Sequence, residues 1–160
     1  MDRFTHPFNP FVTKTSKILI LGTFPSIKSF EDNFYYAHPK NQFWRLLGET
    51  FGYDEPKSID EKKRFLEQQN IALWDMIHSC KRKNSLDSNL KDIKLNDIKA
   101  FLKEYPSIKK ICFTSKTALK LYEKNFSDIK LPIFYLPSPS PAYASVSFEK
   151  KLSEYKRVLL

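Results

Sequence analysis

The most unusual group of side chains lies in the segment 34-FYYAHPKNQFW-44, which combines five aromatic rings with a histidine and the amide of Asn41. Pro39 disfavours helix at His38 and makes a rigid corner, so Asn41 stands where the N-cap of the next helix is expected. The rings form either a lid on the core or the wall of a slot. Asn41 is correspondingly either a helix cap or a polar group held at the mouth of that slot.

Two further segments carry groups that a ligand could use. In 22-GTFPS-26, Gly22 lets the backbone turn sharply and approach a ligand closely. The segment contains neither GxGxxG nor GK[ST], so it is no ordinary phosphate cradle. In 136-LPSPSPAYAS-145 the serines, Ser138 and Ser140 among them, could donate to phosphate oxygens. The alternative for 22-GTFPS-26 is a simple turn, and the alternative for 136-LPSPSPAYAS-145 is a proline-stiffened surface loop.

Asp75 is a carboxylate that follows the apolar run 70-NIALW-74. Buried carboxylates are costly unless they have a partner. Asp75 could be a helix N-cap or form a salt bridge with Lys81 or Arg82. Alternatively, it could contact a ligand.

The pattern of apolar residues indicates which elements position these groups. Strands are expected over 17–21, 70–74, 108–113 and 131–136, and helices over 41–51, 58–69, 95–105, 115–126 and 148–160. Residues 78–91 are expected to be polar loop, and 137–147 a proline- and serine-rich loop.

This alternation of strands and helices predicts one α/β domain over 1–160, with a central, mostly parallel four-stranded sheet and helices on both faces. In such folds ligands bind outside the carboxyl ends of the strands. The rule selects the loops after Leu21, Trp74, Phe113 and Leu136. We therefore expect the side chains described above to meet at one edge of the sheet.

The totals narrow the function class. No apolar run approaches the roughly 18 residues that a membrane span needs, and the N-terminus lacks a signal-peptide pattern, so a cytoplasmic monomer without a membrane partner is expected. The two cysteines, Cys80 and Cys112, cannot supply a four-ligand site, and no metal or cofactor is implied. The net charge of +9 suggests a polyanionic partner such as DNA, although a genome rich in lysine codons would produce the same excess.

No Ser-His-Asp order, HExxH, paired histidines or Walker lysine is present. An aromatic slot, a fixed amide, a carboxylate and a small-residue phosphate loop on a basic protein suit one task. That task is holding a planar base flipped out of a nucleic-acid strand.

These residues resemble the uracil-DNA glycosylase superfamily over nearly the whole chain. The run 36-YAHPKNQFW-44 is similar to the F/Y-A-H-P-x-N-x-F-W of the mismatch-specific branch, and 22-GTFPS-26 and 136-LPSPSP-141 occupy the places of the two short family motifs. The hypoxanthine-DNA glycosylase branch is the most similar, because it shares an L-W-D strand end and an S-L-D-S loop, here 73–75 and 85–88.

The chain departs from the family at three places. Phe24 stands where most branches carry the Asp or Asn that positions water, Leu136 replaces the His or Asn of the second motif, and 114-TS-115 replaces Asn-Gly. In the hypoxanthine-DNA glycosylase branch the Asn of A-H-P-x-N is taken as catalytic, which implies that role for Asn41.

The resemblance implies a monofunctional glycosylase that excises hypoxanthine, xanthine or uracil. Asn41 would hold water or the sugar, and base contacts would come from Gly22, Thr23, Phe24, Tyr36 and Asp75. Sugar or phosphate contacts would come from Ser26, His38, Ser138 and Ser140. The alternatives are a catalytically inactive nucleic-acid-binding protein on the same scaffold, which Phe24 and Leu136 suggest, and an enzyme for free nucleosides.

Overall fold

In the computed structural model, which describes residues 2–83 and 90–160, a four-stranded parallel sheet runs through the middle of the molecule. Its strands follow the order β3 (Ile71–Asp75), β2 (Ile18–Gly22), β6 (Lys110–Phe113) and β7 (Ile133–Tyr135). Apolar residues dominate β2, β3 and β6, which helices cover on both faces. The prediction of a parallel four-stranded α/β sheet is confirmed.

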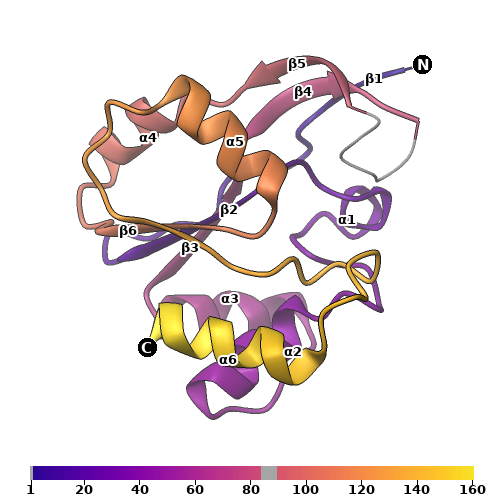
Figure 1. Ribbon diagram of the computed structural model, residues 1–160, viewed down its shortest axis with the longest axis vertical. Helices are drawn as coiled ribbons and strands as arrows, with labels where there is room; N and C mark the ends of the chain where they lie inside the picture. Colours follow the sequence, from indigo (N-terminus) through magenta and orange to yellow (C-terminus); the bar gives the residue numbers. More distant parts are fainter. Residues whose placement is uncertain (1, 84–89) are drawn as a thin grey trace.

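Two separate layers of helices cover the sheet (Figure 1). On one face lie α2 (Phe43–Phe51), α3 (Ile59–Gln68) and α6 (Phe148–Leu159), and their apolar side chains form one core cluster with Ile20 and Leu73. On the other face lie α4 (Ile98–Glu104) and α5 (Lys116–Asn125), which pack with Leu19, Leu21 and Phe113. The short helix α1 (Ile27–Asp32) follows the loop after β2.

Side-chain caps explain where most helices begin. Ser58 and Glu61 form a capping box at α3, and Ser115, Ser147 and Asp97 each accept a backbone N–H at the start of their helices. The predicted helix over 95–105 begins later, at Ile98, because Leu95 belongs to a strand.

The prediction that residues 78–91 are loop was wrong at both ends of this segment. A second sheet, antiparallel and three-stranded, is formed by β1 (Arg3–Thr5), β4 (Ile77–Lys81) and β5 (Lys91–Leu95), in the order β1-β4-β5. Strand β5, KDIKL, is almost wholly exposed, so it has no buried face and lacks the apolar alternation that identifies a strand.

The N-terminal arm joins the two sheets. Its residues 3–5 pair with β4, and Phe11 then forms two backbone hydrogen bonds with Leu73 of β3. As a result the segment between them, which contains His6, passes beside the carboxyl end of β3. Among the described residues, no helix is long and apolar enough to cross a membrane.

Candidate active site

A pocket of about 920 Å³ lies at the carboxyl ends of the parallel strands. It has the size of a small-molecule or cofactor site. All ten residues that the sequence proposed for the site line it: Gly22, Thr23, Phe24, Ser26, Tyr36, His38, Asn41, Asp75, Ser138 and Ser140. The sheet topology therefore gathers residues from four distant segments around one cavity, as the strand-end rule predicts.

Three polar side chains converge over Gly22 in this pocket. A Cβ atom at position 22 would lie 2.6 Å from Oδ1 of Asp75, 3.2 Å from the Tyr36 hydroxyl and 3.6 Å from Oγ1 of Thr114. The Tyr36 hydroxyl and Thr114 Oγ1 are hydrogen-bonded at 2.8 Å. Gly22 is thus required by space, since any side chain would displace the carboxylate.

The partner of Asp75 is His6, a residue that no motif or spacing in the sequence had selected. Nε2 of His6 lies 2.8 Å from Oδ2 of Asp75, and both side chains are more than 90% buried. Among the described residues, neither Lys81 nor Arg82 forms the salt bridge with Asp75 that was the alternative expectation. His6 and Asp75 are 69 positions apart, so only the tertiary path of the N-terminal arm brings them together.

The rings of the 34–44 segment divide between core and pocket. Phe34, Tyr35, Phe43 and Trp44 are buried in the core cluster, and both Tyr35 and Tyr36 line the pocket. Tyr36 has a left-handed backbone conformation, φ 51°, which is rare for a bulky residue. Its ring stacks on Phe43 at 3.8 Å and 17°, so one face is supported by the core. Burial, and then Asp75, raises the pKa of the neighbouring Tyr35 phenol.

Asn41 uses one end of its amide for its own helix. Its Oδ1 accepts a hydrogen bond from the Phe43 N–H at 2.9 Å, although Gln42 occupies the N-cap position. Because the Phe43 N–H is a donor, the oxygen must be the atom that faces it. The Nδ2 group, which can only donate, is what Asn41 can offer to a ligand in the pocket.

Phe24 packs into an aromatic cage. The guanidinium carbon of Arg82 lies 4.9 Å from the Phe24 ring centre, 5.1 Å from that of Phe30 and 5.4 Å from that of Phe4. Arg82 also donates a hydrogen bond to the Pro25 carbonyl. The arginine therefore fixes the 22-GTFPS-26 turn from behind, a contact that the sequence did not reveal.

The hydroxyls of the serine loop are partly used within it. Ser138 Oγ accepts from the Ser140 N–H, and Ser140 Oγ accepts from the Ala142 N–H. An accepting hydroxyl keeps its hydrogen for another partner. Ser26 caps α1 and donates to Ser29, and His38, which is exposed, accepts the Lys40 N–H at Nδ1.

A buried lysine supports the same loop. Nζ of Lys151 in α6 donates to Oε1 of Gln42 at 2.9 Å, and the Gln42 N–H donates to the Pro139 carbonyl at 2.9 Å. Lys151 is 1% exposed, and its burial lowers the pKa of the ammonium group. The chain of bonds links α6, the start of α2 and the loop that lines the pocket.

The positions that differ from the family motifs lie in different parts of the structure. Leu136 is fully buried in the core and does not line the pocket, whereas Thr114 and Ser115 do line it. The 85-SLDS-88 loop lies outside the described residues. Neither Cys80 nor Cys112 is exposed, and burial raises the pKa of both thiols, that of Cys112 to about 12. Within residues 2–83 and 90–160 no group of three potential metal ligands occurs.

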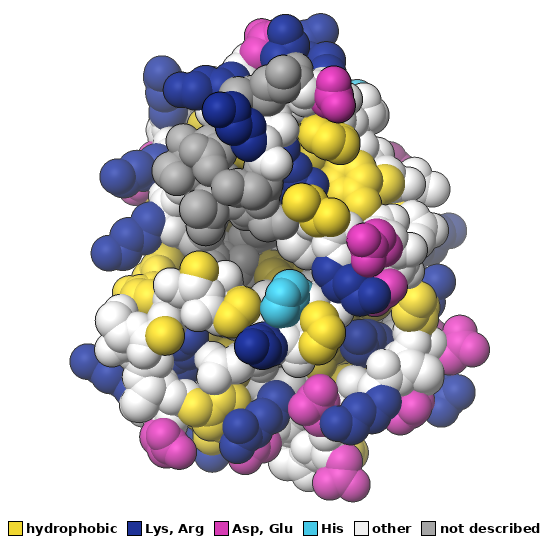
Figure 2. Space-filling view, turned by 90° about the vertical axis from the view of Figure 1, so that its right-hand side faces the viewer, with side chains coloured by type: hydrophobic (Ala, Val, Ile, Leu, Met, Phe, Trp, Pro, Cys, Tyr) yellow, Lys and Arg dark blue, Asp and Glu magenta, His cyan; other side chains and the backbone are white. Residues whose placement is uncertain are grey.

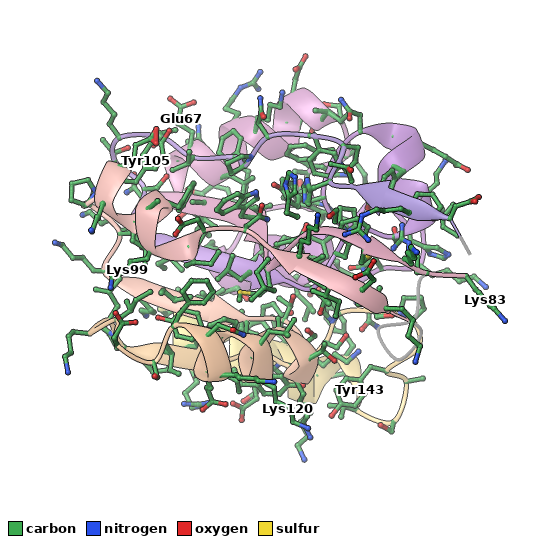
Figure 3. The ribbon with its side chains drawn as sticks, turned by 90° about the horizontal axis from the view of Figure 1, so that it is seen from above. Glu67, Lys83, Lys99, Tyr105, Lys120 and Tyr143 are labelled. Atoms are coloured by element: carbon green, nitrogen blue, oxygen red, sulfur yellow. The ribbon has the colours of Figure 1, made fainter. Side chains whose placement is uncertain are left out.

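Positive charge lies near the pocket mouth. Lys116 lines the pocket, and Lys40 is the exposed neighbour of Asn41. Figure 2 shows lysine and arginine side chains around much of the margin of the face on which α1 lies. Seen from above, Tyr143, another pocket residue, lies toward the end of the molecule that carries Lys83 and away from Lys99 (Figure 3).

Comparison with known proteins found a matching family and similar named proteins. Residues 10–160 match the family described as "Uracil DNA glycosylase superfamily". A protein named hypoxanthine DNA glycosylase from Methanosarcina acetivorans is 32% identical over 152 residues, which cover 94% of this chain and 95% of the relative. A Methanosarcina barkeri protein of the same name is 36% identical over 111 residues, 68% of this chain and 70% of the relative.

A solved structure is similar along almost the whole chain. It is a solution NMR structure from Methanosarcina acetivorans, described as a candidate uracil DNA glycosylase. The two chains are 31% identical, the match covers 95% of this chain and 94% of the other, and the TM-score is 0.84.

Proposed function

The chain belongs to the uracil DNA glycosylase superfamily and is a DNA glycosylase, and we propose that its substrate is hypoxanthine flipped out of DNA. The observation that carries this proposal is the group formed by Asp75, Tyr36 and Thr114 over Gly22 in a pocket of about 920 Å³. The names of the two Methanosarcina relatives support the same base.

Base recognition follows from the acceptor that Asp75 presents. Hypoxanthine carries a hydrogen on N1, next to its carbonyl oxygen, and a carboxylate oxygen can accept that hydrogen. The carbonyl oxygen would meet backbone N–H groups of Thr23 and Phe24 in the turn after β2. Uracil and xanthine share the ring N–H and carbonyl pair and remain candidate substrates, whereas adenine has a lone pair at N1.

Tyr36 would stack on the flipped base with the face that Phe43 does not cover. Stacking between an aromatic ring and a base contributes about 1–3 kcal/mol per base. The core holds Phe43, and the hydroxyl bond to Thr114 holds the edge of the Tyr36 ring. The platform is therefore in place before the base arrives, which reduces the ordering cost of binding.

Asn41 would donate from Nδ2 to the attacking water or to the sugar. An amide is too weakly basic to take a proton from water, and its oxygen already accepts the Phe43 N–H. Base excision passes through a sugar with oxocarbenium character, so little nucleophilic push is needed. A fixed donor that orients water and stabilises developing charge is sufficient for such a reaction.

Ser138 and Ser140 would donate their hydroxyl hydrogens to phosphates beside the flipped nucleotide, and Ser26, the cap of α1, lines the same pocket. His38 accepts the Lys40 N–H at Nδ1, so its neutral ring carries the hydrogen on Nε2 and can donate it to a phosphate. Lys116 and Lys40 would add salt-dependent attraction to the backbone.

Incubation with duplexes that contain deoxyinosine, deoxyxanthosine or deoxyuridine tests this function, with Asn41→Ala alongside. We expect abasic product from deoxyinosine and its loss in the variant. Absence of product from deoxyinosine would exclude the proposed substrate. A non-catalytic binding protein would retain damaged DNA without any abasic product, and nothing in the comparisons supports that alternative.

We further propose that the protein acts as a monomer in the cytoplasm. One chain supplies every residue proposed for the pocket, so a second copy is not needed to complete the site. Size-exclusion chromatography with light scattering would test the first point, and cell fractionation the second.

A further inference from the structure

We propose that His6 is a specificity-determining positioning residue, which holds one oxygen of Asp75 so that the other can act only as a hydrogen-bond acceptor toward the base. The site would then take bases with a ring N–H and reject adenine, the undamaged parent of hypoxanthine. The inference rests on the proposed function, because it explains how a hypoxanthine enzyme avoids attacking normal DNA.

The His6 ring is held on all its functional sides. Nδ1 lies 2.8 Å from the Phe8 carbonyl oxygen and Nε2 lies 2.8 Å from Oδ2 of Asp75. Phe8 and Phe24 pack edge-to-face on the ring at 4.8 and 6.0 Å, and Tyr35 lies at 6.0 Å. The imidazole therefore cannot rotate or flip without breaking both hydrogen bonds.

These contacts determine where the hydrogens lie. A carbonyl oxygen cannot donate, so Nδ1 must carry a hydrogen and give it to Phe8. One remaining proton is then shared between Nε2 and Oδ2, and it stays on the line between these two atoms whichever of them carries it. In both cases Oδ1 of Asp75 bears no hydrogen.

Oδ1 is the atom that lies over Gly22 at the pocket floor. A base that offers a ring N–H is complementary to this atom. Adenine in the same position would place the lone pair of N1 against the lone pairs of Oδ1, and its amino group against the N–H groups that suit a carbonyl. Leaving such buried polar groups unpaired is a strong basis for discrimination.

Other groups around the pair do not replace His6. The titratable neighbours are the Tyr35 phenol, whose hydroxyl donates to the Asn9 carbonyl, and the Tyr36 hydroxyl, which is bonded to Thr114. The guanidinium of Arg82 lies over the Phe24 ring, 4.9 Å from its centre, and Asn96 donates to the backbone oxygen of Asp75. Among the described residues, His6 is the ionic partner of the carboxylate.

His6→Phe tests the inference because it keeps a ring of similar volume and removes both hydrogen bonds. Without His6, no imidazole fixes the hydrogen on the side of Oδ2, and a proton on the carboxyl can lie on Oδ1, where it would donate to adenine. His6→Gln is the milder variant, since its amide reaches Oδ2 but has no basic nitrogen to hold the shared proton. His78→Phe is the matched control, because the His78 side chain is exposed on β4.

The probes are two duplexes that differ only in one non-cleavable nucleotide, 2′-fluoroarabino-inosine or 2′-fluoroarabino-adenosine, and the measurement is the ratio of their dissociation constants at pH 6. We expect the parent and His78→Phe to prefer the inosine duplex at least tenfold. His6→Phe and His6→Gln should bring that ratio to within about threefold of unity. Equal weakening of both duplexes, with the ratio unchanged, would overturn the inference.

Thermal unfolding of each variant shows which of them are folded, and the comparison uses His6→Gln if His6→Phe is not. Excision of hypoxanthine by the parent, measured on the cleavable duplex, tests the proposed function separately from the role of His6. Activity on deoxyinosine with an unchanged binding ratio in the folded His6 variants would overturn the role of His6 and leave the proposed function standing. A parent without that activity would overturn the proposed function and the inference with it.

Discussion

Asp75 lies directly opposite Gly22 in the parallel pairing of β3 with β2, and its Oδ1 occupies the space that a side chain at position 22 would need. The sheet register alone thus places a carboxylate at the floor of the pocket. The glycine keeps that floor open to the base.

Gly22→Ala should damage the site directly. The new Cβ would come within 2.6 Å of Oδ1, and overpacking of this kind costs about 1–3 kcal/mol. If the cost falls on binding of the flipped base, single-turnover excision drops by roughly 5- to 150-fold. Gly52→Ala is the control, because Gly52 has φ 79° and open space around it. That change should cost about 1 kcal/mol of stability without slowing excision, and equal effects on excision would contradict the role of Gly22.

Two substitutions at Tyr36 separate its ring from its hydroxyl. Tyr36→Phe keeps the stack on Phe43 and loses only the bond to Thr114, so binding should weaken by about 0.5–1.5 kcal/mol. Tyr36→Leu removes the platform and should cost about 1–3 kcal/mol of affinity for DNA with a flipped base. Tyr53→Leu, which replaces an exposed tyrosine, should leave the affinity for this DNA unchanged. Titrations with the non-cleavable inosine duplex measure all three, and equal losses in Phe and Leu variants would count against stacking.

Asn41 has a capping role and a proposed chemical role, which Asn41→Ala and Asn41→Asp distinguish. An aspartate oxygen can still accept the Phe43 N–H, so this variant should keep the free energy of unfolding, whereas alanine should lose about 1 kcal/mol. Both variants lack the Nδ2 donor, and both should lose roughly 10²- to 10³-fold in excision rate. Full activity in the aspartate variant would show that donation from Nδ2 is not required.

The variant Asp75→Asn tests whether His6 positions the side chain at position 75. The neutral His6 ring, with Nδ1 donating to Phe8, can accept an amide hydrogen at Nε2. The asparagine oxygen would then face the base, and the preference for inosine over adenosine duplexes should survive. In the double variant His6→Phe/Asp75→Asn the amide can turn, and the preference should disappear. A preference for adenosine in the single variant would contradict the assigned hydrogen positions.

Lys151 should leave a signature in the pH dependence of stability. Burial lowers the pKa of its ammonium group below the ordinary 10.5, so the unfolded chain binds this proton more tightly than the folded one. The contribution of Lys151 to stability therefore rises as pH increases from the folded pKa toward 10.5. Because the buried thiols, whose pKa is raised, act in the opposite direction, the test is a difference between proteins. The change in the free energy of unfolding from pH 8 to pH 10, measured with urea, should be less favourable in Lys151→Met than in the parent and in Lys150→Met, an exposed neighbour. Identical slopes in all three proteins would argue against a perturbed Lys151.

The sequence was sufficient for the parallel sheet and for the pocket residues that follow its strands, such as Gly22, Asp75 and Ser138. Tyr36, His38 and Asn41 lie between two helices instead, and the unusual composition of their segment was the signal that selected them. The sequence could not predict β5, whose exposed and charged residues KDIKL have no apolar alternation. His6 was also missed, since its importance depends on pairing of the N-terminal arm with β4 and with Leu73. The cage of Phe4, Phe24 and Phe30 around Arg82 is likewise a tertiary contact without a local signal.

The central claim is that this pocket excises a base with a ring N–H and spares its normal parent. Single-turnover reactions on two duplexes identical except for deoxyinosine or deoxyadenosine at one position test it most directly. We predict alkali-labile abasic product from the deoxyinosine duplex and none above background from the deoxyadenosine duplex. Comparable product from both duplexes, or product from neither, would contradict the account.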